Sequence, residues 1–174
     1  FNQMCMRIGV DPLASNKGFW SDILGIGDFY YELSVQIIEE CLRTRNVNGG
    51  LIEIHELCAL IKNKRKKQAN DISTDDIKCA ITKVKSLGNG FGVITIGRKE
   101  MVKSVPMEFN RDHTQILSHC QATACGTITQ LMRKTKWTKT RIEQTLNVML
   151  NEGIAWVDTQ GGDETIYWFP SLWE

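Results

Sequence analysis

The spacing of apolar residues predicts a first helix over residues 28–45, with Asp28 placed at its N-cap. The apolar face of this helix consists of Tyr30, Leu33, Ile37, Ile38, Cys41 and Leu42. Residues 46–50 are rich in Asn and Gly and predict a turn, because these residues tolerate backbone angles that a helix cannot use. A short extended piece follows at 51–52, and a second helix is expected over 53–65.

A third helix and a hairpin complete this part of the chain. Ser73 and Asp76 resemble a capping box at the start of the third helix, with Asp in place of the usual Glu. The apolar face of that helix consists of Ile77, Ala80, Ile81, Val84 and Leu87. Two β-prone runs, 91–96 and 101–105, predict a hairpin that Pro106 closes.

The same order of elements recurs in the rest of the chain. The second set comprises helices over 111–121, 130–135 and 138–150, a short strand over 127–129, and a hairpin that pairs 154–158 with 165–169. The third helices align with a constant offset of 65 residues, which matches Ile77 to Ile142 and places Phe91 on Trp156. Upstream of the third helix, the first copy carries about eleven extra residues. A duplicated unit explains this spacing.

The order helix, short strand, helix, helix, hairpin is the winged-helix plan, in which three helices bury their apolar stripes together and the hairpin covers the open edge. We therefore expect an α+β protein, mainly α, with two tandem winged-helix domains over 27–106 and 107–174. Residues 1–26 are rich in Gly, Ser and Asn but also carry apolar residues. They are expected to form an ordered segment packed on the domains.

Charge gives little support to a nucleic-acid-binding role. The chain has 21 basic and 20 acidic residues, a net charge of +1, whereas a dedicated nucleic-acid binder carries a clear basic surplus on one face. The third helix of the first unit begins with two carboxylates. The third helix of the second unit offers Lys136, Lys139 and Arg141 but then Glu143. A tandem winged-helix protein that binds nucleic acid or accompanies transcription is therefore the alternative hypothesis.

The only charge run consists of Lys62, Lys64, Arg65, Lys66 and Lys67. Two interpretations stay open. The run is either a solvated loop between two helices or a membrane-facing basic patch that meets anionic lipid headgroups.

Aromatic residues concentrate near the end of the chain. Four of the five tryptophans lie after residue 136, and a domain of about 70 residues has too small a core to bury all of them. Because side chains alternate along a strand, Tyr167 and Phe169 share one face of the last strand and Trp168 takes the other. The candidates for a partner-binding surface are Trp156, Tyr167, Trp168 and Trp173. The alternative is that they pack against one another over the hairpin and tail.

No arrangement of residues predicts catalysis. The sequence has no Walker loop, no Gly-x-Ser-x-Gly elbow and no convincing nucleophile–base pair. The group His113, His119, Cys120 and Cys125 favours a core role, since a structural zinc site needs four ligands at recurring spacings. We expect no enzyme activity, no cofactor and no metal. No signal peptide or apolar run of about 18 residues is present, so we expect a cytoplasmic protein with reduced cysteines.

Several separated motifs are unusual. They are MCMRIGVDPLA at 4–14, GFW at 18–20, GDFYYEL at 27–33, GNGFG at 88–92, SVP at 104–106 and YWFP at 167–170. Together they closely resemble one family, the ESCRT-II subunits of the Vps twenty-two type, also called SNF eight or EAP thirty. Members of this family carry an N-terminal helical hairpin that is missing here. Since the chain begins at Phe1, we expect a fragment.

The resemblance implies a core subunit that scaffolds an assembly and has no enzymatic role. It implies a stable complex with a GLUE-domain ESCRT-II subunit and two copies of a small winged-helix subunit. It also implies a cytoplasmic protein, peripheral on endosomal membranes, that helps to sort ubiquitinated cargo into multivesicular bodies. Each small subunit is expected to insert a segment containing proline and aromatic residues into a partner's second winged helix.

Overall fold

A computed structural model describes residues 28–65, 72–85, 88, 90–160, 162 and 164–173 of the chain. The expected N-terminal segment at 1–26 lies outside the described residues, as do Lys66, Lys67 and Leu87.

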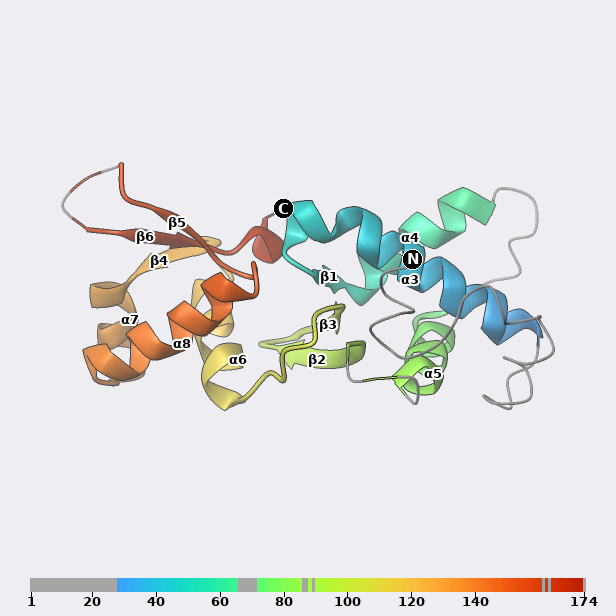
Figure 1. Cartoon of the computed structure of the whole chain (residues 1–174), viewed down its shortest axis with the longest axis horizontal. Coiled ribbons are helices and arrows are strands. Elements are labelled where there is room, and N and C mark those ends of the chain that lie inside the picture. Colours follow the sequence, from blue (N-terminus) through green and yellow to red (C-terminus); the bar gives the residue numbers. More distant parts are fainter. Residues whose placement is uncertain are drawn as a thin grey trace.

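Two sets of elements with the same order follow one another along the chain (Figure 1). The first comprises α3 (Asp28–Asn48), β1 (Leu51–Glu53), α4 (Ile54–Arg65), α5 (Thr74–Lys85), β2 (Gly92–Ile96) and β3 (Lys99–Lys103). The second comprises α6 (Arg111–Cys120), β4 (Cys125–Thr127), α7 (Ile128–Thr135), α8 (Lys139–Asn151), β5 (Trp156–Asp158) and β6 (Ile166–Trp168), with a short 3-10 helix η1 (Pro170–Leu172) at the end. The two sheets have equivalent antiparallel orders, β1-β3-β2 and β4-β6-β5. The expected mixed, mainly helical fold is confirmed, while the domain boundaries stay a prediction.

Reciprocal side-chain caps start several helices. Before α5, Ser73 Oγ accepts a hydrogen bond from the Asp76 amide (3.1 Å), and Asp76 Oδ2 accepts one from the Ser73 amide (2.9 Å). Asn110 and His113 form the same arrangement at α6, where the Asn110 amide donates to His113 Nδ1 (3.1 Å). These caps satisfy amides that have no partner within the helix, so they fix where each helix begins.

The boundaries of several elements differ from the sequence-based prediction. The first hairpin, for example, turns at Gly97 and Arg98, because β3 begins at Lys99 and not at residue 101. Helix α3 continues to Asn48, and the turn is confined to Gly49 and Gly50, which have φ values of +67° and +87°. The strand expected at 127–129 is β4 (Cys125–Thr127), because the Thr127 side chain caps α7 and so starts that helix at residue 128. With α4 and α7 aligned at their first residues, the insertion in the first unit is nine residues, two fewer than expected.

The proposed match of Phe91 with Trp156 is wrong. In the two sheets, Trp156 pairs with Trp168 as Gly92 pairs with Lys103, so Trp156 corresponds to Gly92. Phe91 is buried in the first core, whereas Trp156 is 43% exposed. A shift of one residue in a strand moves a side chain to the other face of the sheet, which accounts for this difference.

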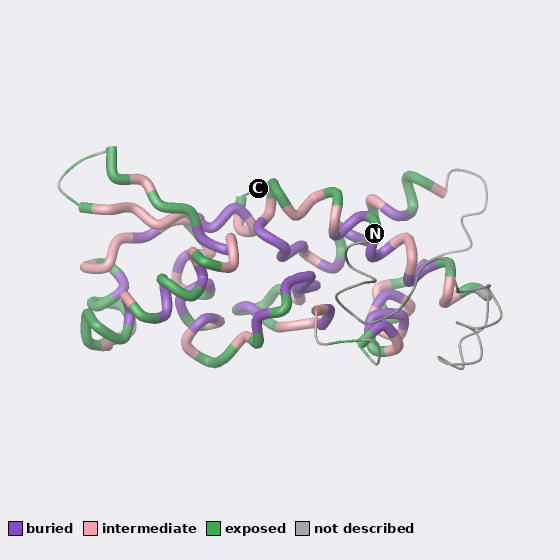
Figure 2. The backbone as a smooth tube through the Cα atoms, viewed as in Figure 1, coloured by how far each residue is buried: buried purple, intermediate pink, exposed green. Residues whose placement is uncertain are grey.

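The first sheet is buried on both faces (Figure 2). Ile52 and Val102, paired across β1 and β3, face a core formed by α3, α4 and α5. Leu51 and Met101 point to the opposite face and belong to a second core. That second core also contains Ile116, Leu117 and Cys120 of α6, Ile142, Leu146 and Met149 of α8, and Phe169. The first hairpin therefore forms one wall of the second unit's core.

Further contacts join the two units. The Gln121 side-chain amide at the end of α6 donates a hydrogen bond to the Ile96 carbonyl oxygen of β2 (2.6 Å). At the end of α3, Gly49 lies so close to Gly153 that a Cβ there would be 2.5 Å from the Gly153 carbonyl oxygen. The units are thus packed together in one elongated molecule (Figure 1).

Candidate protein-docking surface

The second sheet has only one face against its helices. Register places Trp156, Trp168 and Cys125 side by side on the outer face. Tyr167 lies on the inner face opposite Gly126, and it packs against the second core. The predicted alternation along the last strand is present, but it separates Tyr167 from the tryptophans with which it was grouped.

Among the residues that the structure describes, the most exposed aromatic side chains are Trp156 and Trp173, at 43% and 47%. Their rings contact each other edge to face with centroids 5.4 Å apart. Trp168 is half-buried beside Trp156. We call Trp156, Trp168 and Trp173 the tryptophan surface. Aromatic pairs in this geometry are stable, and ordered apolar rings in contact with water favour association with another polypeptide.

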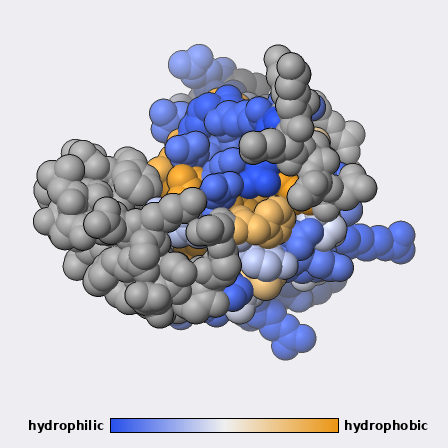
Figure 3. Space-filling model, turned by 90° about the vertical axis from the view of Figure 1, so that its right-hand side faces the viewer, coloured by the Kyte–Doolittle hydropathy of each residue, from blue (hydrophilic) through white to orange (hydrophobic). Residues whose placement is uncertain are grey.

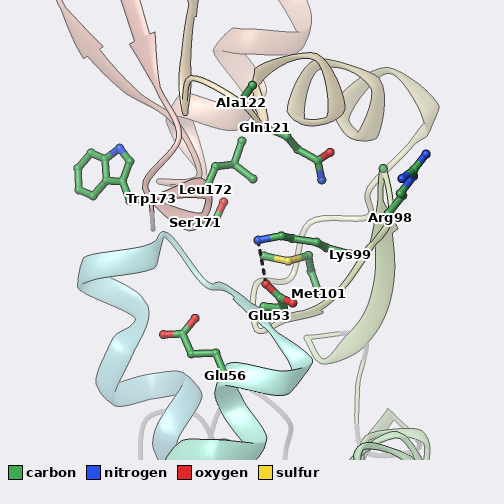
Figure 4. A pocket seen from close by; sticks show the side chains of 11 residues that line it. Glu53, Glu56, Arg98, Lys99, Met101, Gln121, Ala122, Ser171, Leu172 and Trp173 are labelled. Carbon is green, nitrogen blue, oxygen red and sulfur yellow. Dashed lines mark ion pairs between the residues drawn. The ribbon is translucent and has the colours of Figure 1, made fainter.

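A cavity of about 510 Å³ lies beside Trp173, between the two units (Figure 4). Leu172 and Met101 contribute apolar lining, and exposed Glu56 and Arg98 bring opposite charges to it. Other lining residues are already engaged, since Lys99 forms an ion pair with Glu53 at 3.1 Å. Ser171 Oγ is buried and has no hydrogen-bond partner among the described residues. This cavity could not be predicted from the sequence, because its lining residues come from separate elements.

The basic run at the end of α4 is partly engaged within the first unit. Lys64 forms an ion pair with Glu40, a carboxylate that is 1% exposed and also accepts hydrogen bonds from Arg43 (2.7 and 3.0 Å). Burial alone would raise the pKa of the Glu40 carboxyl, but Lys64 and Arg43 outweigh burial and hold that pKa below its ordinary value. Lys64 therefore stabilises the contact between α3 and α4.

Arg65 is engaged as well, because its Nε donates to Gln36 (2.6 Å) and its guanidinium lies over the Phe29 ring. Lys62 is exposed, while Lys66 and Lys67 lie outside the described residues. On this end of the molecule, the coloured part of the surface in Figure 3 is mostly hydrophilic, with some apolar residues among the hydrophilic ones. A membrane-facing role for the run stays a prediction, and Lys62 is the described residue best placed for it.

The histidines and cysteines considered as a metal site do not converge. His113 is buried and accepts the Asn110 hydrogen bond described above, and Cys120 is buried in the second core. Within the described ranges, no group of three or more His, Cys, Asp or Glu residues is arranged to hold a metal ion. In the same part of the chain, no helix combines the length and apolar character needed to cross a membrane.

Comparison with known proteins establishes the family of this chain. A model of the EAP30/Vps36 family matches residues 1–159. The chain belongs to the EAP30/Vps36 family. It is 52% identical over 176 residues to the vacuolar-sorting protein SNF8 of Dictyostelium discoideum, covering 99% of this chain and 71% of that protein. It is 49% identical over 172 residues to the Homo sapiens protein of the same name, covering 99% and 67%.

A solved structure is also similar to this chain. It is the crystal structure of the endosomal complex ESCRT-II (VPS22/VPS25/VPS36), which matches with a TM-score of 0.67 and 34% identity over 98% of this chain and 76% of that one. The family resemblance drawn from the sequence motifs is thereby confirmed.

Proposed function

We propose that this chain is a non-enzymatic core subunit of the ESCRT-II endosomal sorting complex, built as two tandem winged-helix domains that hold partner subunits at fixed positions. The family membership and the likeness to a VPS22/VPS25/VPS36 assembly support this role. The comparisons do not favour the nucleic-acid-binding alternative. The function in the cell is to scaffold the sorting of ubiquitinated cargo into multivesicular bodies, as a cytoplasmic protein peripheral on endosomal membranes.

One observation supports protein docking on the second unit more than any other. When the two sheets are superimposed by register, Trp168 corresponds to Lys103 and Trp156 to Gly92. The face of the first sheet that holds these two residues also holds Leu51 and Met101, and the second unit covers it. In the second sheet the equivalent face carries the tryptophan surface, and none of the described elements packs over it as α6 does on the first sheet. A partner polypeptide would take the place there that α6 takes in the first unit.

The partner for this face is the small winged-helix subunit, and the GLUE-domain subunit completes the complex. A segment with proline and aromatic side chains suits the face, because flat rings pack well against exposed indoles and a preformed extended segment loses little entropy on binding. The cavity beside Trp173 offers a place for one such side chain.

The test is capture of the small subunit by variants of the full-length protein. Trp156→Ala combined with Trp173→Ala should weaken capture by roughly 30-fold or more, since central tryptophans in interfaces contribute about 2 kcal/mol or more. Met132→Ala and Val148→Ala remove exposed apolar side chains elsewhere on the same unit and serve as matched controls. Unchanged capture by the tryptophan variant would refute the assignment of this surface.

A further inference from the structure

A second cluster of positive charge lies in the second unit. Residues 133–141 read RKTKWTKTR, with five cations and no acidic residue in nine positions. Arg133 and Lys134 lie in the last turn of α7, and Lys139 and Arg141 lie in the first turn of α8. All five cationic side chains are exposed. We call Arg133, Lys134, Lys136, Lys139 and Arg141 the basic tip.

The turn between α7 and α8 gathers these charges at one end of the molecule. Lys136 adopts the left-handed conformation (φ 62°), and its amide donates to the Met132 carbonyl oxygen, which ends α7. Thr138 then caps α8. The turn lies at the end of the elongated molecule opposite the start of α3, and Figure 2 shows its surroundings as largely exposed (Figures 1 and 2).

Two of the cations hold the tip in shape. Arg141 donates two hydrogen bonds of 2.8 Å to the Asp112 carboxylate and lies over the Trp137 ring, 4.1 Å from its centroid. Lys134 Nζ donates to the His119 carbonyl oxygen (2.8 Å). These contacts tie the turn to α6, so the tip is a preformed surface whose shape does not depend on a ligand.

The other three cations are available to a ligand. Lys136 has no side-chain hydrogen bond or ion pair within the residues that the structure describes. Lys139 is 3.7 Å from Glu143 in an exposed pair, which holds it only weakly. Arg133 lies near enough to Glu164 to interact with its charge, but no hydrogen bond joins the two side chains in the described part of the chain. The positive charges of Arg133, Lys136 and Lys139 are therefore exposed to solvent and available to an anionic ligand.

We propose that the basic tip binds the surface of a bilayer rich in anionic phospholipids. Charge complementarity supports this partner, since each Lys or Arg near an anionic membrane strengthens binding about fivefold at low salt. Trp137, half-buried beneath Arg141, adds the amphipathic ring that favours a membrane–water interface. The proposal does not depend on the ESCRT-II assignment, and the tip lies apart from both the tryptophan surface and the basic run of α4.

The distribution of charge argues against DNA as the partner. A helix that enters a DNA groove needs basic residues along its exposed face. After Arg141, residues 142–151 of α8 contain no Lys or Arg and include Glu143. The charge is confined to the end of the molecule, which suits contact with a broad surface.

The test uses the full-length protein, purified with the subunits it assembles with, and phosphatidylcholine vesicles with or without about 30 mol% phosphatidylserine. The variant combines Arg133→Gln, Lys136→Gln and Lys139→Gln, which leaves the contacts of Lys134 and Arg141 intact. A control variant with Arg45→Gln, Lys78→Gln and Lys85→Gln removes the same net charge from the first unit, away from the basic run of α4 and from the cavity beside Trp173.

At low salt, we expect the wild type and the control to sediment with anionic vesicles and the tip variant to bind at least tenfold more weakly. Subunit capture and thermal unfolding should be unchanged in the tip variant, which separates this result from failure of the docking surface. Equal losses in both variants would overturn the proposal, because net charge alone would then explain binding. Wild-type binding to duplex DNA but not to anionic vesicles would overturn it in favour of nucleic acid.

Discussion

The close approach of Gly49 to Gly153 yields a quantitative test of how the two units pack. Both glycines have positive φ, +67° and +77°. A Cβ at Gly49 would be 2.5 Å from the Gly153 carbonyl oxygen and 3.0 Å from Ile154 Cα, whereas a Cβ at Gly153 would meet no atom within 4 Å. The two positions share the backbone strain of a non-glycine residue and differ in the contact alone.

Gly153→Ala should therefore cost about 1–2 kcal/mol of unfolding free energy, the usual penalty for a left-handed L-residue. Gly49→Ala should cost a further 1–3 kcal/mol or so, since the obstructing atoms are backbone and the units must shift apart to admit the methyl group. Urea unfolding of both variants measures the difference. Equal destabilisation within about 0.5 kcal/mol would show that the units are not packed as described.

Two further predictions concern buried ionisable groups. Glu40→Gln should destabilise the protein by about 1–3 kcal/mol at neutral pH, because it removes a carboxylate that accepts hydrogen bonds from Arg43 and pairs with Lys64. Since the folded-state pKa of Glu40 is lowered, this stabilisation is present above its unfolded pKa and is lost as pH falls. The gap between wild type and variant in urea unfolding should shrink near pH 3, and a gap that is constant with pH would contradict the ion-pair account. Burial lowers the pKa of His113, so the folded state resists its protonation and stability should decline as pH falls below about 6.5. His113→Gln keeps a side chain able to complete the cap at α6, as Gln130 does at α7, and should flatten that part of the pH profile.

The elements that the sequence predicts correctly are those with local signals, such as a helical spacing of apolar residues or a capping residue. The third helices carry both an apolar period and a cap, so Ile77 and Ile142 were matched correctly and both are fully buried. Strand β4 was misplaced because Cys125 and Gly126 have little β propensity. They are extended because they pair with Trp168 and Tyr167, residues far away along the chain.

The features of the candidate site that the sequence did not reveal depend on contacts between segments that lie far apart along the chain. Alternation predicted that Tyr167 and Trp168 lie on opposite faces, but only the packing of the sheet on its helices decides which face is outward. The sequence places Lys136, Lys139 and Arg141 at the start of a helix, but threonines separate the five cations of the basic tip, so the sequence shows no unbroken basic run there. The left-handed turn at Lys136 is what brings them together.

The burial of the first sheet on both faces has a consequence for how such a chain can change over time. Its hairpin supplies apolar residues to two cores at once, with Val102 on one side and Met101 on the other. A substitution at Met101 must be accommodated by the second core, to which α6 of the second unit contributes. Neither unit can therefore be deleted, exchanged or lengthened without a matching adjustment in the other.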